Sequence, residues 1–320
     1  MSPHFSWSLG NPHTGNWISW VLISLLLYIP FCEVIRRHQK QRMIRRYGPL
    51  ETMTLDEAYA IKSWMSEHEF PKTFSAAIGI VFFKAEGIPS IAKLVAGAAQ
   101  RSPSSSKGSS KPRPGASTTP GALLGRPGST ATRTAIDRVN YIHSLYRPSG
   151  KMSDADLLYV LSLFALEPLR CIQRFEWRGP TPEERCALAT LLKALGEELQ
   201  IPFDRLPSCE AGFRDALHWL EELEAWGVEY GRRNREVSPE SVFLAQKQFE
   251  AWLGNVPSPL KGVARGLLAA LFEPGVRRAM GIKNPSRISV VIVETIVCVR
   301  RFVRGYFCSP VALVKGYTHG

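Results

Sequence analysis

Apolar side chains recur at three- and four-residue spacing along most of this chain, which is the pattern of helices with one buried face. The pattern predicts helices over nine stretches: 54–70, 72–87, 90–100, 134–147, 153–178, 181–200, 213–231, 239–254 and 260–272. The sequence shows no alternation of strand and helix patterns and no internal repeat. We therefore predict an all-α, multi-helix globular domain.

Several predicted helices begin with residues that satisfy the free amide groups of a first turn. Thr54 with Glu57, and Thr181 with Glu184, have the spacing of a capping box. Ser153 precedes an acidic first turn, which suits the positive end of a helix dipole. These signals fix where three of the helices should begin.

The C-terminal stretch that starts at residue 287 is ambiguous, because its run of β-branched residues is typical of a strand. In an otherwise helical chain, we favour a helix that lies against the core or against a membrane surface.

The segment 17–35 has the composition of one transmembrane helix, with Trp17 at one end and Tyr28 near the other. A cleaved signal peptide is the alternative. It would need a basic start and a small-residue cleavage site, and both are missing. We therefore predict a retained membrane anchor.

A basic block follows this segment directly and contains no acidic residue. Its cations are Arg36, Arg37, Lys40, Arg42, Arg45 and Arg46. Positive charge stays on the cytosolic side of a membrane and attracts anionic headgroups. We expect residues 1–16 to form a short lumenal tail, the rest of the chain after the anchor to face the cytosol, and residues 17–46 to contact lipid.

Residues 101–132 are rich in Ser, Pro, Gly and Thr and offer little to bury, so a disordered linker is predicted there. A flexible loop, a phosphorylatable insert and a gene-model error such as a retained intron are all compatible with this composition. The linker separates N-terminal helices, 36–100, from a main helical domain, 133–320.

The net charge of +12 and the pI of about 9.6 suggest a nucleic acid or an anionic membrane as partner. The basic block explains part of this charge, and no RNP, zinc-finger or helix-turn-helix signature is present, so no nucleic-acid partner is predicted. The six cysteines are scattered without metal-finger spacing, which indicates reduced thiols.

Familiar catalytic motifs are absent: the chain has no P-loop, no GxGxxG, no GxSxG and no HExxH. Asp215 and His218 form one Asp-x-x-His pair, whereas a di-iron bundle needs two Glu-x-x-His pairs and two further carboxylates. We interpret His218 as a structural histidine.

Two polar residues within apolar helical stretches remain as candidates. Glu167 either pairs with Arg170 or Arg174, which is the favoured interpretation, or serves as a catalytic base. His143 shares a helix face with apolar Val139, and a buried imidazole needs a partner for each ring nitrogen. That partner is a protein group, a water or an iron atom, and residue types alone favour the first.

Six stretches together resemble a known family. They are YGPLETMTLDEAYAI, EFPKTF, GIPSIAKL, RVNYIHSLYR, LSLFALEPLRCIQRFEW and LEELEAW. In this order they are similar to fungal ER-bound oxygenases of the mycophenolic acid pathway type, which are distant relatives of the catalytic domain of rubber oxygenase (latex-clearing protein). The resemblance runs from about residue 36 to 280, apart from the linker.

The resemblance implies an all-α oxygenase that holds haem b through one histidine in an arginine-rich helix with a pattern like RLxHAxxR. His143 is the matching position, and Arg138 and Arg147 would neutralise the haem propionates or orient the helix. The family also has an upstream Arg-x-x-x-Thr helix. Arg126 and Thr130 have its spacing here, but Pro-Gly lies between them.

The function implied is a membrane-anchored, haem-dependent oxygenase of fungal secondary metabolism on the cytosolic side of the endoplasmic reticulum. Its substrate would be a hydrophobic prenylated, terpenoid or polyketide intermediate, oxidised or cleaved at a double bond with dioxygen. Other pathway enzymes are possible partners. The alternative is a catalytically inactive relative that serves as a membrane-bound scaffold or binding protein.

Overall fold

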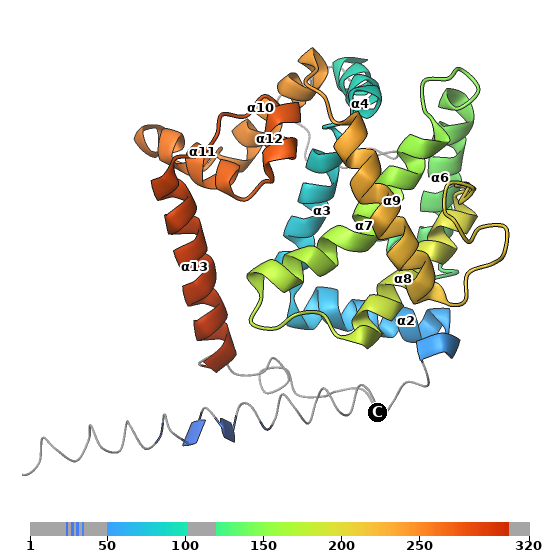
Figure 1. The fold of residues 1–320 in the computed structure, drawn as a ribbon, viewed down its shortest axis with the longest axis horizontal. Coiled ribbons are helices and arrows are strands. Elements are labelled where there is room, and N and C mark those ends of the chain that lie inside the picture. Colours follow the sequence, from blue (N-terminus) through green and yellow to red (C-terminus); the bar gives the residue numbers. More distant parts are fainter. Residues whose placement is uncertain are drawn as a thin grey trace, which may run out of the picture. The chain divides into compact units, whose positions relative to one another are not determined.

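The computed structural model describes residues 50–101 and 120–306, together with helical positions 24, 27, 28, 30, 31 and 34. Every regular element in this part of the chain is a helix, which confirms the all-α prediction (Figure 1). A compact unit spans Tyr47–Arg301, and a second unit comprises Met1–Arg46 and Phe302–Gly320.

The described helices follow one another with short connections. The α-helices are α2 (Leu55–Ser63), α3 (Pro71–Ala85), α4 (Pro89–Arg101), α5 (Pro120–Leu123), α6 (Thr130–Tyr146), α7 (Asp154–Phe175), α8 (Pro182–Glu198), α9 (Ala216–Asn234), α10 (Pro239–Trp252), α11 (Lys261–Ala270), α12 (Pro274–Ala279) and α13 (Arg287–Tyr306). Three short helices join them: the 3₁₀ helices η1 (Leu50–Thr52) and η3 (Ser258–Leu260), and the π-helix η2 (Trp64–Glu69).

The predicted helix starts are confirmed. Thr54 caps α2 and Thr181 caps α8, each with a complete capping box, and Ser153 caps α7. The ambiguous C-terminal stretch is also helical, as α13, so its β-branched composition does not produce a strand.

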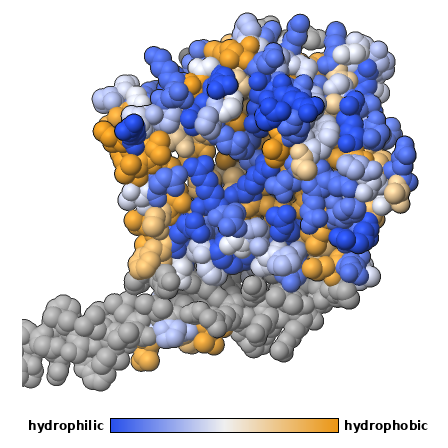
Figure 2. Space-filling view, in the orientation of Figure 1, coloured by the Kyte–Doolittle hydropathy of each residue, from blue (hydrophilic) through white to orange (hydrophobic). Residues whose placement is uncertain are grey.

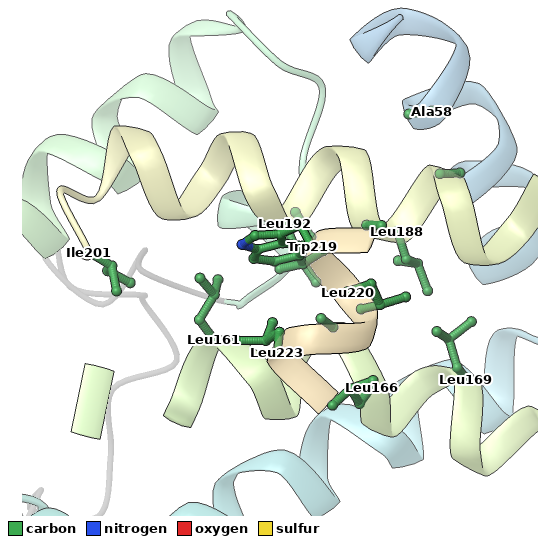
Figure 3. Close-up of a cluster of buried hydrophobic side chains, with 14 of the residues drawn as sticks. Ala58, Leu161, Leu166, Leu169, Leu188, Leu192, Ile201, Trp219, Leu220 and Leu223 are labelled. Atoms are coloured by element: carbon green, nitrogen blue, oxygen red, sulfur yellow. The ribbon is translucent and has the colours of Figure 1, made fainter. Parts of the chain in front are cut away.

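The main core lies where α2, α7, α8 and α9 meet. Trp219 of α9 is fully buried among leucines of α7 and α8, including Leu161, Leu188 and Leu192 (Figure 3). A smaller aromatic cluster joins α3 to α10 and α12, with the rings of Phe83 and Phe272 at 4.4 Å. Burial of this apolar surface is the main stabilising contribution to the fold.

The structure differs from the predicted linker at residues 120–132, which are ordered. They form α5, a turn and the first residues of α6, which Ser129 caps. Leu124 is buried in the main core, and its carbonyl accepts a hydrogen bond of 2.6 Å from Nζ of Lys62. The average composition of the stretch hides this local apolar pair. Arg101, the first residue of the predicted linker, ends α4, and residues 102–119 lie outside the described residues.

The predicted tail 1–16, the basic block and most of the predicted transmembrane helix 17–35 also lie outside the described residues. Among the helices that the structure does describe, none combines the length and the apolar character needed to cross a bilayer.

One arginine connects the loop after α7 to two other helices. Arg178 donates paired hydrogen bonds of 2.6–2.8 Å to Glu69 of η2 and to Glu184 of α8, and its guanidinium lies over the ring of Phe70. Glu184 is fully buried. Burial raises the pKa of Glu69 although Arg178 acts in the opposite direction. Arg178 is therefore the counter-charge of two carboxylates removed from water.

Arg178→Met is expected to destabilise the fold by about 3–5 kcal/mol near neutral pH, because it leaves two buried carboxylates without a cation. The loss should be smaller at about pH 5 than at about pH 7.5. Without Arg178 both carboxyl groups have raised pKa values in the folded state, so acid protonates them there before it protonates the unfolded chain. Chemical denaturation followed by circular dichroism measures both quantities.

The matched control is Arg232→Met, which removes a surface arginine bound to Glu229 on the same helix. It should change stability little at either pH, because exposed ion pairs contribute little. An equal loss in the two variants, or a loss in Arg178→Met that ignores pH, would contradict this interpretation of Arg178.

Candidate functional site

His143 lies on the inward face of α6, next to the end of α8. The C-terminal half of α6 is fixed there by Asn140, which donates to the carbonyl of Glu198 at 3.0 Å, and by Arg147, which donates to that of Gln200 at 3.0 Å. Val139 packs against the main core, and His143 is buried. The face predicted from the spacing of apolar residues is therefore the packed face.

The imidazole of His143 is incompletely satisfied by the described protein. Its Nδ1 is buried and has no hydrogen-bond partner, whereas the backbone of Leu199 does make a hydrogen bond to the ring. Burial lowers the pKa of His143, the charge of Arg147 lowers it further, and the Leu199 contact acts in the opposite direction. A neutral ring with one unused nitrogen lone pair is the form that ligates a metal.

This arrangement can supply one protein ligand to iron. In the described part of the chain, no group of three or more His, Cys, Asp and Glu side chains is placed to hold a metal ion. Haem needs no such group, because the porphyrin supplies four nitrogens and the protein adds an axial ligand. The donor chemistry of His143 therefore fits haem better than a metal ion held by protein side chains alone.

The two arginines that flank His143 differ in their surroundings. Arg138 is exposed, and its guanidinium stacks on the ring of Tyr141 at 5.5 Å. Arg147 forms an ion pair of 2.6 Å with Asp154 at the start of α7, in addition to its bond to Gln200. Arg147 thus holds the end of α6 in position, whereas Arg138 has no ion-pair partner among the described residues.

Glu167 lies in a buried network of charges on another part of α7. It is 2% exposed and binds Nζ of Lys84 at 2.9 Å and Nη1 of Arg170 at 3.0 Å. Lys84 also binds Glu273 at 2.8 Å, and Arg170 binds Glu224 of α9 at 3.1 Å. The Arg170 contact matches the favoured pairing interpretation, and a catalytic role for Glu167 stays a prediction.

Sequence reasoning missed Lys84. The signal was present, since Lys84 is a single cation in the apolar run GIVFFKAEG, just as Glu167 is a single acid in LSLFALEPL. Two opposite charges in apolar faces of neighbouring helices indicate a buried pair. His143 and Glu167 share no hydrogen-bond or ion-pair partner, so the structure does not join them in one constellation.

His218 has the local contacts of a structural residue. Its backbone amide donates to the N-cap Asp215 at 2.7 Å, and its Nε2 lies 3.1 Å from Glu222 one turn further on. The Asp-x-x-His spacing therefore arises from helix capping.

Comparison with known proteins places this fold in a family. Residues 95–305 match the family described as ER-bound oxygenase mpaB/B'/Rubber oxygenase, catalytic domain. This range contains both His143 and Glu167. No solved structure matches the chain.

Three fungal relatives are similar over most of the chain. ER-bound oxygenase mpaB' of Penicillium brevicompactum is 31% identical over 303 residues, covering 91% of this chain and 70% of the relative. ER-bound oxygenase mpaB of Penicillium roqueforti (strain FM164) is 33% identical over 277 residues, covering 83% and 90%. ER-bound oxygenase mpaB of Penicillium brevicompactum is 36% identical over 251 residues, covering 72% and 62%.

The order of helices, the position of His143 within the matched range and these similarities agree with one another. This chain is an oxygenase that belongs to the family of ER-bound oxygenases mpaB/B' and rubber oxygenase catalytic domains.

Proposed function

We propose that this oxygenase depends on haem b and that His143 is the axial ligand of the iron. The observation that carries the proposal is the buried Nδ1 of His143 without a partner. A buried polar atom left unpaired costs about 1–3 kcal/mol. A bond to iron would remove this cost, and the lowered pKa keeps the ring in the neutral form that ligation requires.

The chain's own residues would hold the group as follows. His143 would supply the protein ligand, and the Leu199 contact on the same ring would fix its orientation. Arg138 would be available for a propionate because it carries no ion pair, whereas Arg147 would keep α6 seated against α7 and the end of α8. Bound haem would supply dioxygen activation.

The substrate class follows from the family and from the apolar interior. An oxygenase of this family acts on a small molecule. We propose a hydrophobic prenylated, terpenoid or polyketide intermediate of fungal secondary metabolism, oxidised or cleaved at a carbon–carbon double bond. Such a substrate partitions into lipid, which suits an enzyme held at a membrane.

We further propose that the protein is bound to the endoplasmic reticulum by segment 17–35, with residues 36–46 on the cytosolic side. Its relatives are named ER-bound oxygenases. The apolar run followed by six cations has the charge order of an anchor whose C-terminal side stays in the cytosol.

His143→Ala is expected to abolish haem retention while leaving helix content almost unchanged. The substitution removes the bond to iron but little buried apolar area. The absorbance band of haem in protein purified after haem supplementation, together with far-UV circular dichroism, measures the two effects.

The matched control is His218→Ala, which removes a histidine whose contacts are all local and should retain haem. A full haem spectrum in His143→Ala would refute the ligand assignment. If the wild-type protein takes up no haem at all, the haem proposal fails, and a scaffold or binding role becomes the better account of His143.

Protease added to intact microsomes is expected to digest the helical domain and to spare only the N-terminal tail and anchor. The reason is the basic block after residue 35, which should remain cytosolic. Immunoblotting with tags at the two ends of the chain measures this. Protection of the whole domain without detergent would reverse the proposed orientation.

A further inference from the structure

Helix α13 presents an apolar side to the solvent. Successive residues of an α-helix are about 100° apart, so Cys298, Val291, Ile288, Ile292 and Ile296 fall within one arc of about 160°. All five are exposed, Ile288 to 72% and Val291 to 63%. A helix on the surface of a globular protein normally turns this side inward.

The charged side of α13 is the side that holds it to the protein. Nη2 of Arg300 binds the fully buried Glu176 at 2.7 Å, and Glu294 binds Arg174 of α7 at 3.1 Å. Between them Val293 is buried. These contacts fix the rotation of the helix, so its apolar arc faces away from the rest of the unit.

Neighbouring α11 adds to the same hydrophobic region. A Cβ on Gly266 of α11 would come within 3.0 Å of Oγ of Ser289, so the two helices are in close contact. Val263 of α11 is 58% exposed. Figure 2 shows hydrophobic side chains gathered along the edge of the molecule where Figure 1 places α11 and α13. Contiguous exposed apolar surface of this kind marks an interaction site.

The charges around this face are almost all positive. From residue 277 to 306 the chain has seven cations and one acid, Glu294, which is already paired. The exposed cations include Lys283, Arg287 and Arg301. Arg287 and Arg301 lie at one border of the apolar arc, by the same helical spacing. An apolar stripe with cations beside it is complementary to an anionic lipid surface.

We propose that α13 lies in the plane of an anionic membrane surface, with Ile288, Val291, Ile292 and Ile296 among the acyl chains and the bordering arginines at the headgroups. The proposal rests on the membrane association proposed above and adds a second contact, far along the chain from segment 17–35. The helix carries four arginines and one glutamate, so it lies along the membrane and does not cross it.

A second protein is a poorer occupant of this face. Between Ile288 and Val299 the outward side carries aliphatic residues, a threonine and a cysteine but no aromatic residue. Specific protein interfaces depend on anchors such as Trp, Tyr and Arg that fill pockets of the partner. Aliphatic side chains without such anchors suit a fluid acyl layer, which imposes no fixed shape.

The exposed thiol of Cys298, at the edge of the apolar arc, gives a direct test. The full-length protein is placed, one copy per disc, in lipid nanodiscs of phosphatidylcholine alone or with phosphatidylserine. It is then treated with a membrane-impermeant maleimide, and peptide mass spectrometry gives the rate at each cysteine. Relative to partly exposed Cys209, Cys298 should react about tenfold more slowly when phosphatidylserine is present.

The variant Ile288→Glu with Val291→Glu should restore fast modification of Cys298 in the anionic discs, because charges within the apolar arc oppose insertion. The matched control is Val228→Glu, an exposed apolar position on α9, which should leave the slow rate unchanged. Both variants should keep wild-type helix content, since all three side chains are exposed.

Cys32 separates this inference from the proposal on which it rests. If Cys32, within segment 17–35, is shielded while Cys298 reacts at the rate of Cys209, the anchor stands and the α13 contact is refuted. If neither is shielded, both proposals fail. Shielding of Cys298 only with two copies per disc would identify a second copy of the chain as the occupant and overturn the lipid assignment. Equal shielding in neutral discs would overturn the choice of an anionic surface.

Discussion

The buried ion pair between Lys84 of α3 and Glu167 of α7 is the interaction on which the arrangement of the helices depends. It joins a helix that precedes residues 102–119 to one that follows them. Through Lys84 the pair extends to Glu273 at the start of α12, and through Arg170 to Glu224 of α9. Removal of either partner would leave an uncompensated charge in the core, which costs about 3–5 kcal/mol.

This network constrains the rotation of the helices more strictly than apolar packing does. Leucines tolerate small shifts past one another, whereas a buried carboxylate must meet its cation at about 2.9 Å. Arg178 imposes the same constraint between η2 and α8. With these positions fixed, α6 has a defined surface to pack on, and His143 is held with one ring nitrogen away from water and from protein donors.

The proposed chemistry and the proposed membrane contact follow from departures from ordinary packing. At His143 a buried polar atom lacks a partner, and on α13 a set of apolar side chains lacks cover. In both places the local structure is otherwise well supported, by the bonds of α6 to the end of α8 and by the ion pairs of α13 with α7. Features that break a packing rule within well-formed structure are where function is expected.

The sequence alone determined the helices and their starts, because capping and apolar periodicity are local properties. Thr54, Ser153 and Thr181 begin helices where their side-chain chemistry indicated. The sequence also indicated which face of α6 is buried, and with it His143 as a candidate. What it determined about the family came from short stretches in a fixed order.

Only the tertiary structure decided which side chains meet. Lys84 and Glu167 are 83 positions apart, so no local rule pairs them. Composition averaged over residues 101–132 concealed Leu124, which is buried because Lys62 and the core are there to receive it. The outward direction of α13's apolar side likewise depends on Arg174 and Glu176, two residues of a different helix end. Local chemistry forms a helix, but the side that it buries is settled by the charges and surfaces that other segments bring to it.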